Sequence, residues 1–285
     1  IIKMNTIANL PENAEIKKAV NDYCKERGLS KSSFAFRCGV SDATIAALMK
    51  EKWDTLSKDM LLRIWNYINR DNFKDLYQSS DFLGAFDACE KSRKYKFMIG
   101  ITADTGMGKT TALRTYARQK NVFYVSYDKT MNASQFFISL LRELAIPYTG
   151  TLNDMMNYAA DKLNRLENPL LVIDEAGKLT HSMILYLQVL RDRTCTNCGI
   201  ILAGMPYFKM NLQKNAEREK EGYAEFLRRI NIWHAFIGLQ PKEIEEICRL
   251  KGITDKERVR SLKKYRRFGD LMNEIYLEKI LNEEL

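Results

Sequence analysis

The segment that most constrains this fold is a run of eight residues, Ala103 to Thr110. It reads Ala-Asp-Thr-Gly-Met-Gly-Lys-Thr, which fits the phosphate-binding loop pattern G-x-x-x-x-G-K-[ST] except that alanine stands first. An apolar run, Phe97 to Ile101, precedes it, and a helix-compatible run, Thr111 to Ala117, follows it. A buried strand, a glycine-containing loop and a helix in this order predict a nucleotide site.

The residue types of the loop suit a bound triphosphate. Gly106 and Gly108 allow the backbone to turn its N–H groups toward the β- and γ-phosphates. Lys109 would neutralise phosphate charge, the Thr110 hydroxyl would be a ligand of Mg²⁺, and Thr111 would reach the α-phosphate side. We therefore expect ATP to contact every residue of the segment: Ala103, Asp104, Thr105, Gly106, Met107, Gly108, Lys109, Thr110 and Thr111.

A second acidic element follows a run of four apolar residues, Leu170 to Ile173, and consists of Asp174 and Glu175. The apolar run predicts a strand buried on both faces, and its carboxyl end is where ligands bind in open parallel sheets. We expect Asp174 to bind ATP through hydrated Mg²⁺. Glu175 would orient the water that attacks the γ-phosphate, which makes Lys109 and Glu175 the expected catalytic pair.

Composition narrows the class of protein. The 285 residues carry a net charge of +9, which favours a polyanionic partner. The nine basic residues between Arg249 and Arg267 would either contact phosphates or form a solvated helical face. No apolar run reaches the ~20 residues of a membrane span, and no signal peptide is visible. The six cysteines are scattered, which favours a reducing cytoplasm. Cys195 and Cys198 have the spacing of zinc ligands, but the sequence offers no second cysteine pair or histidines to complete a zinc site, so we do not expect one.

The first 70 residues predict a small helical bundle with helices at 12–28, 31–50 and 58–68. Within 31–50, a small residue, a turn glycine and core-facing aliphatic residues have the spacing of a helix-turn-helix, with Ser41 as the cap of its second helix. This resembles the helix-turn-helix of phage-repressor-like domains. Its outward positions include few base-reading side chains, so we expect weak sequence preference for duplex DNA. The candidate DNA contacts are Lys31, Thr44, Lys50 and Lys52.

After residue 80 the chain alternates between strand-like and helical runs. Further strands are expected at 122–126, 200–203 and 232–237, and helices at 81–90, 134–145, 153–166 and 182–191, with a charged helix ending at 230. Such alternation predicts a parallel α/β sheet. Neither His181 nor His234 belongs to a metal-ligand pattern, so structural roles are expected for both.

Residues 81–285 resemble the AAA+ ATPases, and the run Leu187 to Gly204 looks like the phage Mu B-like transposition ATPases, which also carry a helix-turn-helix ahead of the ATPase. The resemblance implies an ATP-dependent DNA-binding protein that forms a helical filament or ring, selects target DNA and recruits a transposase. The implied organisation is a helix-turn-helix domain at 1–70, a linker at 71–80, an AAA+ P-loop core at 81–240 and a small, basic, helical lid at 241–285.

The same resemblance implies an arginine finger that a neighbouring subunit supplies to the γ-phosphate. Arg228 and Arg229 end the helix before the last strand, where AAA+ proteins place it, and Arg191 and Arg193 are rivals because their helix is expected to end near the nucleotide. Capping of their own helix is the alternative role of Arg228 and Arg229.

Two departures from the family pattern leave other functions open. Ala203-Gly204-Met205 lacks the usual polar sensor, and Gly269-Asp270 stands where a glycine–asparagine pair usually precedes a sensor arginine, a role that Arg266 or Arg267 would have to take. The alternatives are a DNA-binding regulator that binds nucleotide without useful turnover and another oligomeric AAA+ ATPase, such as a helicase loader or a secretion-associated ATPase.

Overall fold

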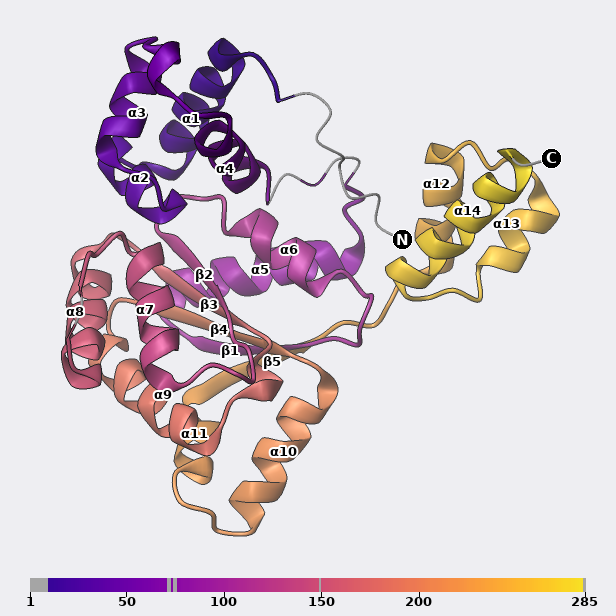
Figure 1. The fold of residues 1–285 in the computed structure, drawn as a ribbon. Helices are drawn as coiled ribbons and strands as arrows, with labels where there is room; N and C mark the ends of the chain where they lie inside the picture. The colour runs from indigo at the N-terminus through magenta and orange to yellow at the C-terminus, as the bar shows by residue number, and fades with distance from the viewer. Residues whose placement is uncertain (1–9, 71–72, 74–75, 149, 284–285) are drawn as a thin grey trace.

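A parallel sheet forms the centre of the molecule (Figure 1). Within residues 10–70, 73, 76–148 and 150–283, which the computed structural model describes, five strands pair in the order β2-β3-β4-β1-β5. The strands are β1 (Met98–Thr102), β2 (Val122–Ser126), β3 (Leu170–Asp174), β4 (Gly199–Gly204) and β5 (Ile230–Ala235). Every pairing is parallel. The inner strands β3, β4 and β1 are buried at every position, as a parallel sheet covered on both faces requires.

Helices cover both faces of the sheet. One face packs against α7 (Ala133–Glu143), α8 (Leu152–Arg165), α9 (His181–Thr194), α10 (Pro206–Glu217) and α11 (Tyr223–Arg229). The other packs against α5 (Ser80–Tyr95) and α6 (Lys109–Tyr116). A glycine is required at the start of β4, because a Cβ on Gly199 would lie 2.4 Å from the carbonyl oxygen of Ser92 in α5.

The N-terminal helices surround a separate apolar core. They are α1 (Asn13–Arg27), α2 (Lys31–Cys38), α3 (Asp42–Met49), the 3₁₀ helix η1 (Trp53–Thr55) and α4 (Lys58–Asn69). Ser41 caps α3, as predicted, by accepting a hydrogen bond from the Thr44 N–H. Gly39 ends α2 with a φ of 76°, a left-handed conformation that glycine adopts without strain.

The C-terminal helices form a fourth apolar cluster. They are α12 (Pro241–Leu250), α13 (Lys256–Leu262) and α14 (Phe268–Glu283), and we call them the lid. Of the expected linker at 71–80, residues 71, 72, 74 and 75 lie outside the described residues. The last residues of this expected linker are packed against the rest of the protein, because Tyr77 contacts the apolar cluster of the lid and Ser80 begins α5.

The expected strands and helices of the central region are confirmed with shifts of a few residues at their ends. The charged segment before β5 is different, because it forms two helices, α10 and α11, instead of one. Gly222, with a φ of 79°, stands at the start of α11 and allows the chain to reverse there. As a result, β5 begins at Ile230, two residues earlier than expected.

One side chain of the N-terminal helices faces the opposite way from its prediction. Thr44 of α3 was expected to face outward, but it is buried. Its hydroxyl shares a hydrogen bond of 2.8 Å with Ser41 at the cap of the same helix, which draws the side chain inward.

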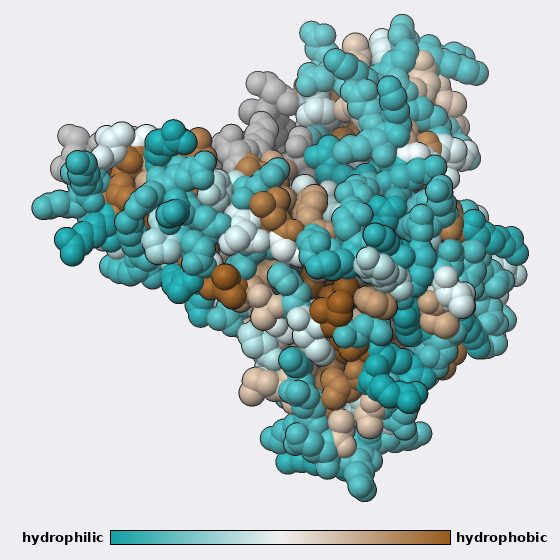
Figure 2. Space-filling view, turned by 180° about the vertical axis from the view of Figure 1, so that it is seen from behind, coloured by the Kyte–Doolittle hydropathy of each residue, from teal (hydrophilic) through white to brown (hydrophobic). Residues whose placement is uncertain are grey.

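The surface is predominantly hydrophilic on the face seen from behind, with apolar side chains gathered near the middle of that face (Figure 2). Among the described helices, none combines the length and the apolar composition needed to cross a membrane.

Candidate nucleotide site

The phosphate-binding loop connects β1 to α6 and turns through two glycines. Gly106 and Gly108 have φ angles of 77° and 88°, in the left-handed region that favours glycine. Gly108 is the N-cap of α6, so the loop ends at a helix N-terminus, where free N–H groups attract anions. The departure at Ala103 has a simple explanation. Its N–H donates to the Gly204 carbonyl at 3.1 Å, so this residue prolongs the β1–β4 ladder and needs no glycine.

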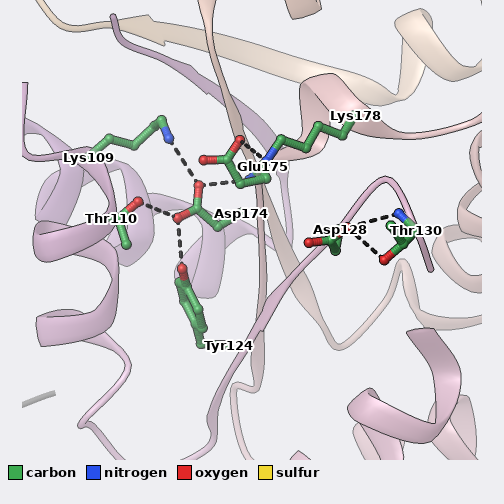
Figure 3. Close-up of polar contacts among 8 residues, drawn as sticks. All are labelled: Lys109, Thr110, Tyr124, Asp128, Thr130, Asp174, Glu175 and Lys178. Carbon is green, nitrogen blue, oxygen red and sulfur yellow. Dashed lines mark hydrogen bonds and ion pairs between the residues drawn. The ribbon is translucent and has the colours of Figure 1, made fainter. Parts of the chain in front are cut away.

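Lys109, Thr110 and Asp174 meet at the carboxyl edge of the sheet (Figure 3). The Lys109 ammonium lies 3.1 Å from one oxygen of the Asp174 carboxylate, and the Thr110 hydroxyl donates to the other at 2.7 Å. Two further donors complete the shell of the carboxylate, the Tyr124 hydroxyl at 2.7 Å and the Glu175 N–H at 2.8 Å. The structure therefore joins the loop and the acidic strand end in one hydrogen-bonded cluster.

The Asp174 carboxyl is ionised in this cluster. Burial alone would raise its pKa, but the Lys109 charge and the hydrogen bonds from Thr110, Tyr124 and Glu175 together hold that pKa below its ordinary value. Only 1% of the side chain is exposed, so the charge depends on these donors and not on water. The same charge, together with burial, raises the pKa of the Tyr124 phenol, which therefore stays protonated as a donor.

The Glu175 carboxylate lies beside the cluster and forms an ion pair with Lys178, whereas the Glu175 N–H donates to Asp174. The Glu175 backbone has a φ of 60°, a left-handed conformation that costs a non-glycine residue about 1–3 kcal/mol. This turn directs the side chain away from Asp174, and the carboxylate, about one-third exposed, lies 3.3 Å from the Lys178 ammonium (Figure 3). A half-free carboxylate held next to a phosphate-binding loop can accept a proton from water or orient it.

The lid closes over the loop. The Gly269 N–H donates to the Gly106 carbonyl at 2.8 Å, and the Arg267 guanidinium lies 3.5 Å from the Asp104 carboxylate. A cavity of about 340 Å³ remains between the loop and the lid. The residues that line it are Ala103, Asp104, Thr105, Gly106, Gly108, Lys109, Thr110, Thr111, Glu175, Met205, Phe268 and Gly269.

The donors present fit a phosphate chain with Mg²⁺. Among the described residues no group of three or more His, Cys, Asp or Glu side chains could hold a metal. Mg²⁺ needs no such group, because it commonly binds through one or two protein oxygens and completes its shell with phosphate oxygens and water. Thr110 and Asp174 supply one hydroxyl and one carboxylate for that purpose.

The candidate finger arginines lie at the other edge of the sheet. Ile230, which follows Arg229, pairs with Met98 at the start of β1. The phosphate-binding loop follows the other end of β1, so the length of that strand, about 13 Å, separates the paired arginines from the loop of the same chain. Arg229 makes two hydrogen bonds with the Asp192 carboxylate, at 2.8 and 2.7 Å, and a third with the Glu225 carbonyl. Arg228 is exposed and forms no hydrogen bond or ion pair with any described residue.

The expectation that Arg191 and Arg193 lie near the nucleotide is wrong. Helix α9 ends next to the beginning of β4, at the edge opposite the loop. Arg191 is buried and donates to the carbonyls of Cys198 and Lys96, at 3.0 and 2.6 Å, so it holds the starts of two strands together. Arg193 is hydrogen-bonded to Asn157 of α8.

The four predicted DNA contacts separate into three groups. Lys50 and Lys52 are exposed at the end of α3. Lys31 donates to the Val20 carbonyl at 3.4 Å and so lies partly against α1. Thr44 is buried and cannot contact DNA without rearrangement, which corrects its assignment.

Sequence reasoning missed two neighbours of the acidic pair, Tyr124 and Lys178. Register offers a signal for Tyr124: Ser126 pairs with Asp174, and Tyr124, two residues earlier in β2, faces the same side of the sheet. No pattern in the sequence indicates Lys178, because its approach to Glu175 depends on the left-handed turn. The histidines line no part of this cavity; His181 stacks on Tyr223, and burial lowers the pKa of His234.

Replacing Tyr124 by phenylalanine should weaken this cluster in a pH-dependent way. The lost hydrogen bond to a carboxylate is worth about 1.5–3 kcal/mol of unfolding free energy at pH 7. Because the Asp174 pKa is depressed in the folded protein, this stabilisation is present above pH 4 or so and disappears as pH falls through the folded value. Urea unfolding across that range measures it.

Tyr127→Phe is the matched control, because the Tyr127 hydroxyl donates to the neutral Met131 carbonyl at 3.0 Å. Its loss should not depend on pH in this range. Equal pH dependence of the two variants would contradict the role of Tyr124 at Asp174.

No curated protein matches the sequence. Several solved structures are similar to this chain at low sequence identity. One is AMPPCP-bound DnaA from Aquifex aeolicus, with 19% identity and a TM-score of 0.49 over 72% of this chain and 63% of that chain. A second is Aeropyrum pernix ORC1 in complex with DNA, with 13% identity and a TM-score of 0.47 over 62% of this chain and 50% of that chain. A third is NtrX from Brucella abortus in complex with ATP, with 15% identity and a TM-score of 0.47 over 81% of this chain and 58% of that chain. The chain spans less than two thirds of each of them.

The family comparison gives the firmest result. Residues 92–212 match the AAA domain family, and this segment contains the phosphate-binding loop, Asp174 and Glu175. The match supports ATPase activity. The five-stranded parallel sheet and the phosphate-binding loop between β1 and α6 give the chain a P-loop ATPase fold, within which residues 92–212 are similar to the AAA domain family.

Proposed function

We propose that this chain is an ATP-dependent DNA-binding ATPase that assembles on duplex DNA, selects a transposition target and recruits a transposase. The observation that carries the ATPase part is the cluster of Lys109, Thr110 and Asp174, with the partly exposed Glu175 carboxylate beside it and paired with Lys178. Lys109 binds phosphate oxygens, and Glu175 orients the attacking water. Thr110 and Asp174 hold Mg²⁺, which neutralises phosphate charge when bound.

DNA binding is supported by the N-terminal helices and by charge. Helices α2 and α3 are joined by a short turn at Gly39, and Lys50 and Lys52 lie exposed at the end of α3. The net charge of +9 favours a polyanionic partner. With Thr44 buried, the exposed positions offer phosphate contacts and hardly any base contacts, so affinity without a strong sequence preference is the expected outcome.

Transposition is the finer part of the proposal. It is supported by the resemblance of the run Leu187 to Gly204 to the Mu B-like ATPases and by the order of the helical and ATPase regions in the chain. In the structure this run includes most of α9 and all of β4. A transposase is the partner that this resemblance implies.

A shared nucleotide site is part of the same proposal. Arg228 lies at the sheet edge opposite its own loop, so it can reach only the γ-phosphate bound by a neighbouring copy. Of the two paired arginines it is the better candidate, because Arg229 is already bound to Asp192 and to the Glu225 carbonyl. A planar guanidinium suits the charge that spreads over the transferred phosphoryl group.

One observation favours a second function, a regulator that uses ATP as a ligand. The cavity wall after β4 is Met205, which has no polar group to contact a γ-phosphate. ATP hydrolysis would be slow if no other side chain supplied a polar contact to the γ-phosphate. Arg267, at the lid, lies near enough to the loop to do so.

The ATPase part predicts a separation of binding from turnover. Lys109→Ala should abolish ATP binding, because the only ammonium group lining the cavity is lost. Glu175→Gln should bind ATP like the wild type and lose hydrolysis by roughly a hundredfold or more, because the amide accepts no proton. Fluorescent-nucleotide binding and phosphate release measure the two effects. Equal turnover of Glu175→Gln and the wild type would remove Glu175 from its role.

The shared site predicts complementation. Arg228→Ala should bind ATP normally and lose turnover by roughly a thousandfold, as arginine fingers do. Mixing it with Lys109→Ala should restore part of the activity, since each variant supplies the half-site that the other lacks. Arg218→Ala, a change at an exposed arginine just after α10, is the control. A mixture that stays inactive, although both variants are folded and co-assemble, contradicts sharing.

The DNA part predicts ATP-dependent assembly whose affinity rises with duplex length. Replacing Lys50 and Lys52 by glutamine should lower the slope of log affinity against log salt by about 2 and weaken all sequences equally. Lys18→Gln with Lys25→Gln, on the exposed side of α1, is the charge-matched control. Fluorescence anisotropy and electron microscopy provide the measurements. Discrimination of roughly a thousandfold for one operator would favour the regulator instead.

A further inference from the structure

A second cavity lies between the N-terminal helices and the ATPase core. Its volume is about 300 Å³, and it is separate from the nucleotide site. The N-terminal side is formed by the end of α1 and the first turns of α2. The core side is formed by the segment after α6, the start of β2 and the ends of α7 and α8.

Cationic and polar side chains line this cavity together with apolar ones, among them Leu29, Phe123 and Leu166. Arg27, Arg37 and Lys162 contribute three cations, and no carboxylate is among the lining residues. Ser30 and Ser33 add two hydroxyls at the N-terminus of α2, where the helix dipole also favours an anion. The nearest carboxylates belong to Glu143, which lies against Arg37, and Glu26, which pairs with Arg118 at 3.0 Å.

Arg37 is the observation that points to a ligand. Its side chain is only 5% exposed, yet its guanidinium makes no hydrogen bond with any described residue. Its nearest anionic partner, the Glu143 carboxylate, is 3.9 Å away, beyond hydrogen-bond distance, and its Nε has no acceptor. Leaving buried charged donors without acceptors costs several kcal/mol. The buried Nε therefore lacks an acceptor, while Glu143 and the Phe123 ring, 5.6 Å from the guanidinium carbon, compensate part of the charge.

The geometry of α2 places Arg37 and Ser33 on the same side of the helix. They are four residues apart, the spacing at which side chains on a helix are neighbours, and both line the cavity. Arg27 is already engaged, since it donates to the Ala117 carbonyl at 3.0 Å and lies over the Tyr23 ring. It contributes charge to the cavity and holds the N-terminal helices against the end of α6.

We propose that this cavity binds a small phosphate-type oxyanion, either inorganic phosphate or the phosphate group of a small metabolite. A tetrahedral oxyanion supplies several acceptors at once, which matches a planar guanidinium with two hydroxyls and a lysine around it. The cavity volume is at the small end for ligand sites. Because its walls come from both parts of the chain, the bound anion stabilises the docking of the N-terminal helices on the core.

The test uses the full chain with Lys109→Ala, so that the nucleotide loop no longer binds phosphate. Isothermal titration with inorganic phosphate at low salt should give one saturable site, and phosphate should raise the Tm. Adding Ser33→Ala and Lys162→Gln should weaken phosphate binding by about tenfold or more. Arg37→Gln should abolish it, and the Ser33–Lys162 variant keeps the test valid if Arg37→Gln does not fold. Lys242→Gln, exposed on α12, is the control and should bind phosphate as its parent does.

A parallel titration with AMP distinguishes the two sources of the phosphate. Tighter binding of AMP than of phosphate assigns the site to a phosphorylated metabolite, and equal or weaker binding assigns it to the free anion. Two results overturn the proposal. The first is phosphate binding that does not saturate or is unchanged in every variant, which means an adventitious ion only. The second is duplex DNA displacing phosphate from the cavity, which would make it a contact for the DNA backbone.

Discussion

The buried ion pair between Lys109 and Asp174 is the interaction on which the nucleotide site depends. It joins α6 to the end of β3 across β4, which lies between β1 and β3 in the sheet. Two charges this deep are tolerated only when their remaining hydrogen-bonding capacity is satisfied, and Thr110, Tyr124 and the Glu175 N–H satisfy the carboxylate. The small residues that end β4, Ala203 and Gly204, occupy the strand that the pair must cross. One electrostatic contact thus sets the position of the phosphate-binding loop relative to the acidic strand.

Helix α6 connects this site to both helical regions. At its N-terminal end, the loop is held by the lid through the hydrogen bond between Gly269 and Gly106. At its C-terminal end, Arg27 of α1 donates to the Ala117 carbonyl. The segment that leads from β5 into the lid is anchored to α5, because the buried Asp81 carboxylate accepts hydrogen bonds from the N–H groups of Ile237 and Gly238. A displacement of the loop would therefore change its contact with the lid directly and would change the contact between α6 and the N-terminal helices through α6.

The arginines at the amino edge of the sheet have different roles. At the amino edge, Arg191 holds strand starts together and Arg229 holds α11 to Asp192, so neither is available for a ligand. Arg228, next to Arg229 in the chain, remains exposed because its side chain leaves the helix in another direction. Identical residue types thus have structural or potential catalytic roles according to the partners that the fold places beside them.

Local patterns in the sequence determined the loop, the apolar strand before Asp174, the parallel alternation and the helix caps, because each depends on neighbours a few residues away. Only the tertiary structure decided which distant groups meet. Tyr124 reaches Asp174 through strand register, Lys178 reaches Glu175 through a left-handed turn, and α9 ends at the amino edge, contrary to the expectation for Arg191. Thr44 is buried by its own cap although its spacing indicates an outward position. The outcomes for Tyr124 and Arg191 follow from packing and from the burial of charge, which connect residues far apart in the chain. The contacts of Lys178 and Thr44 span only three residues and depend on the turn or cap that the folded backbone forms there.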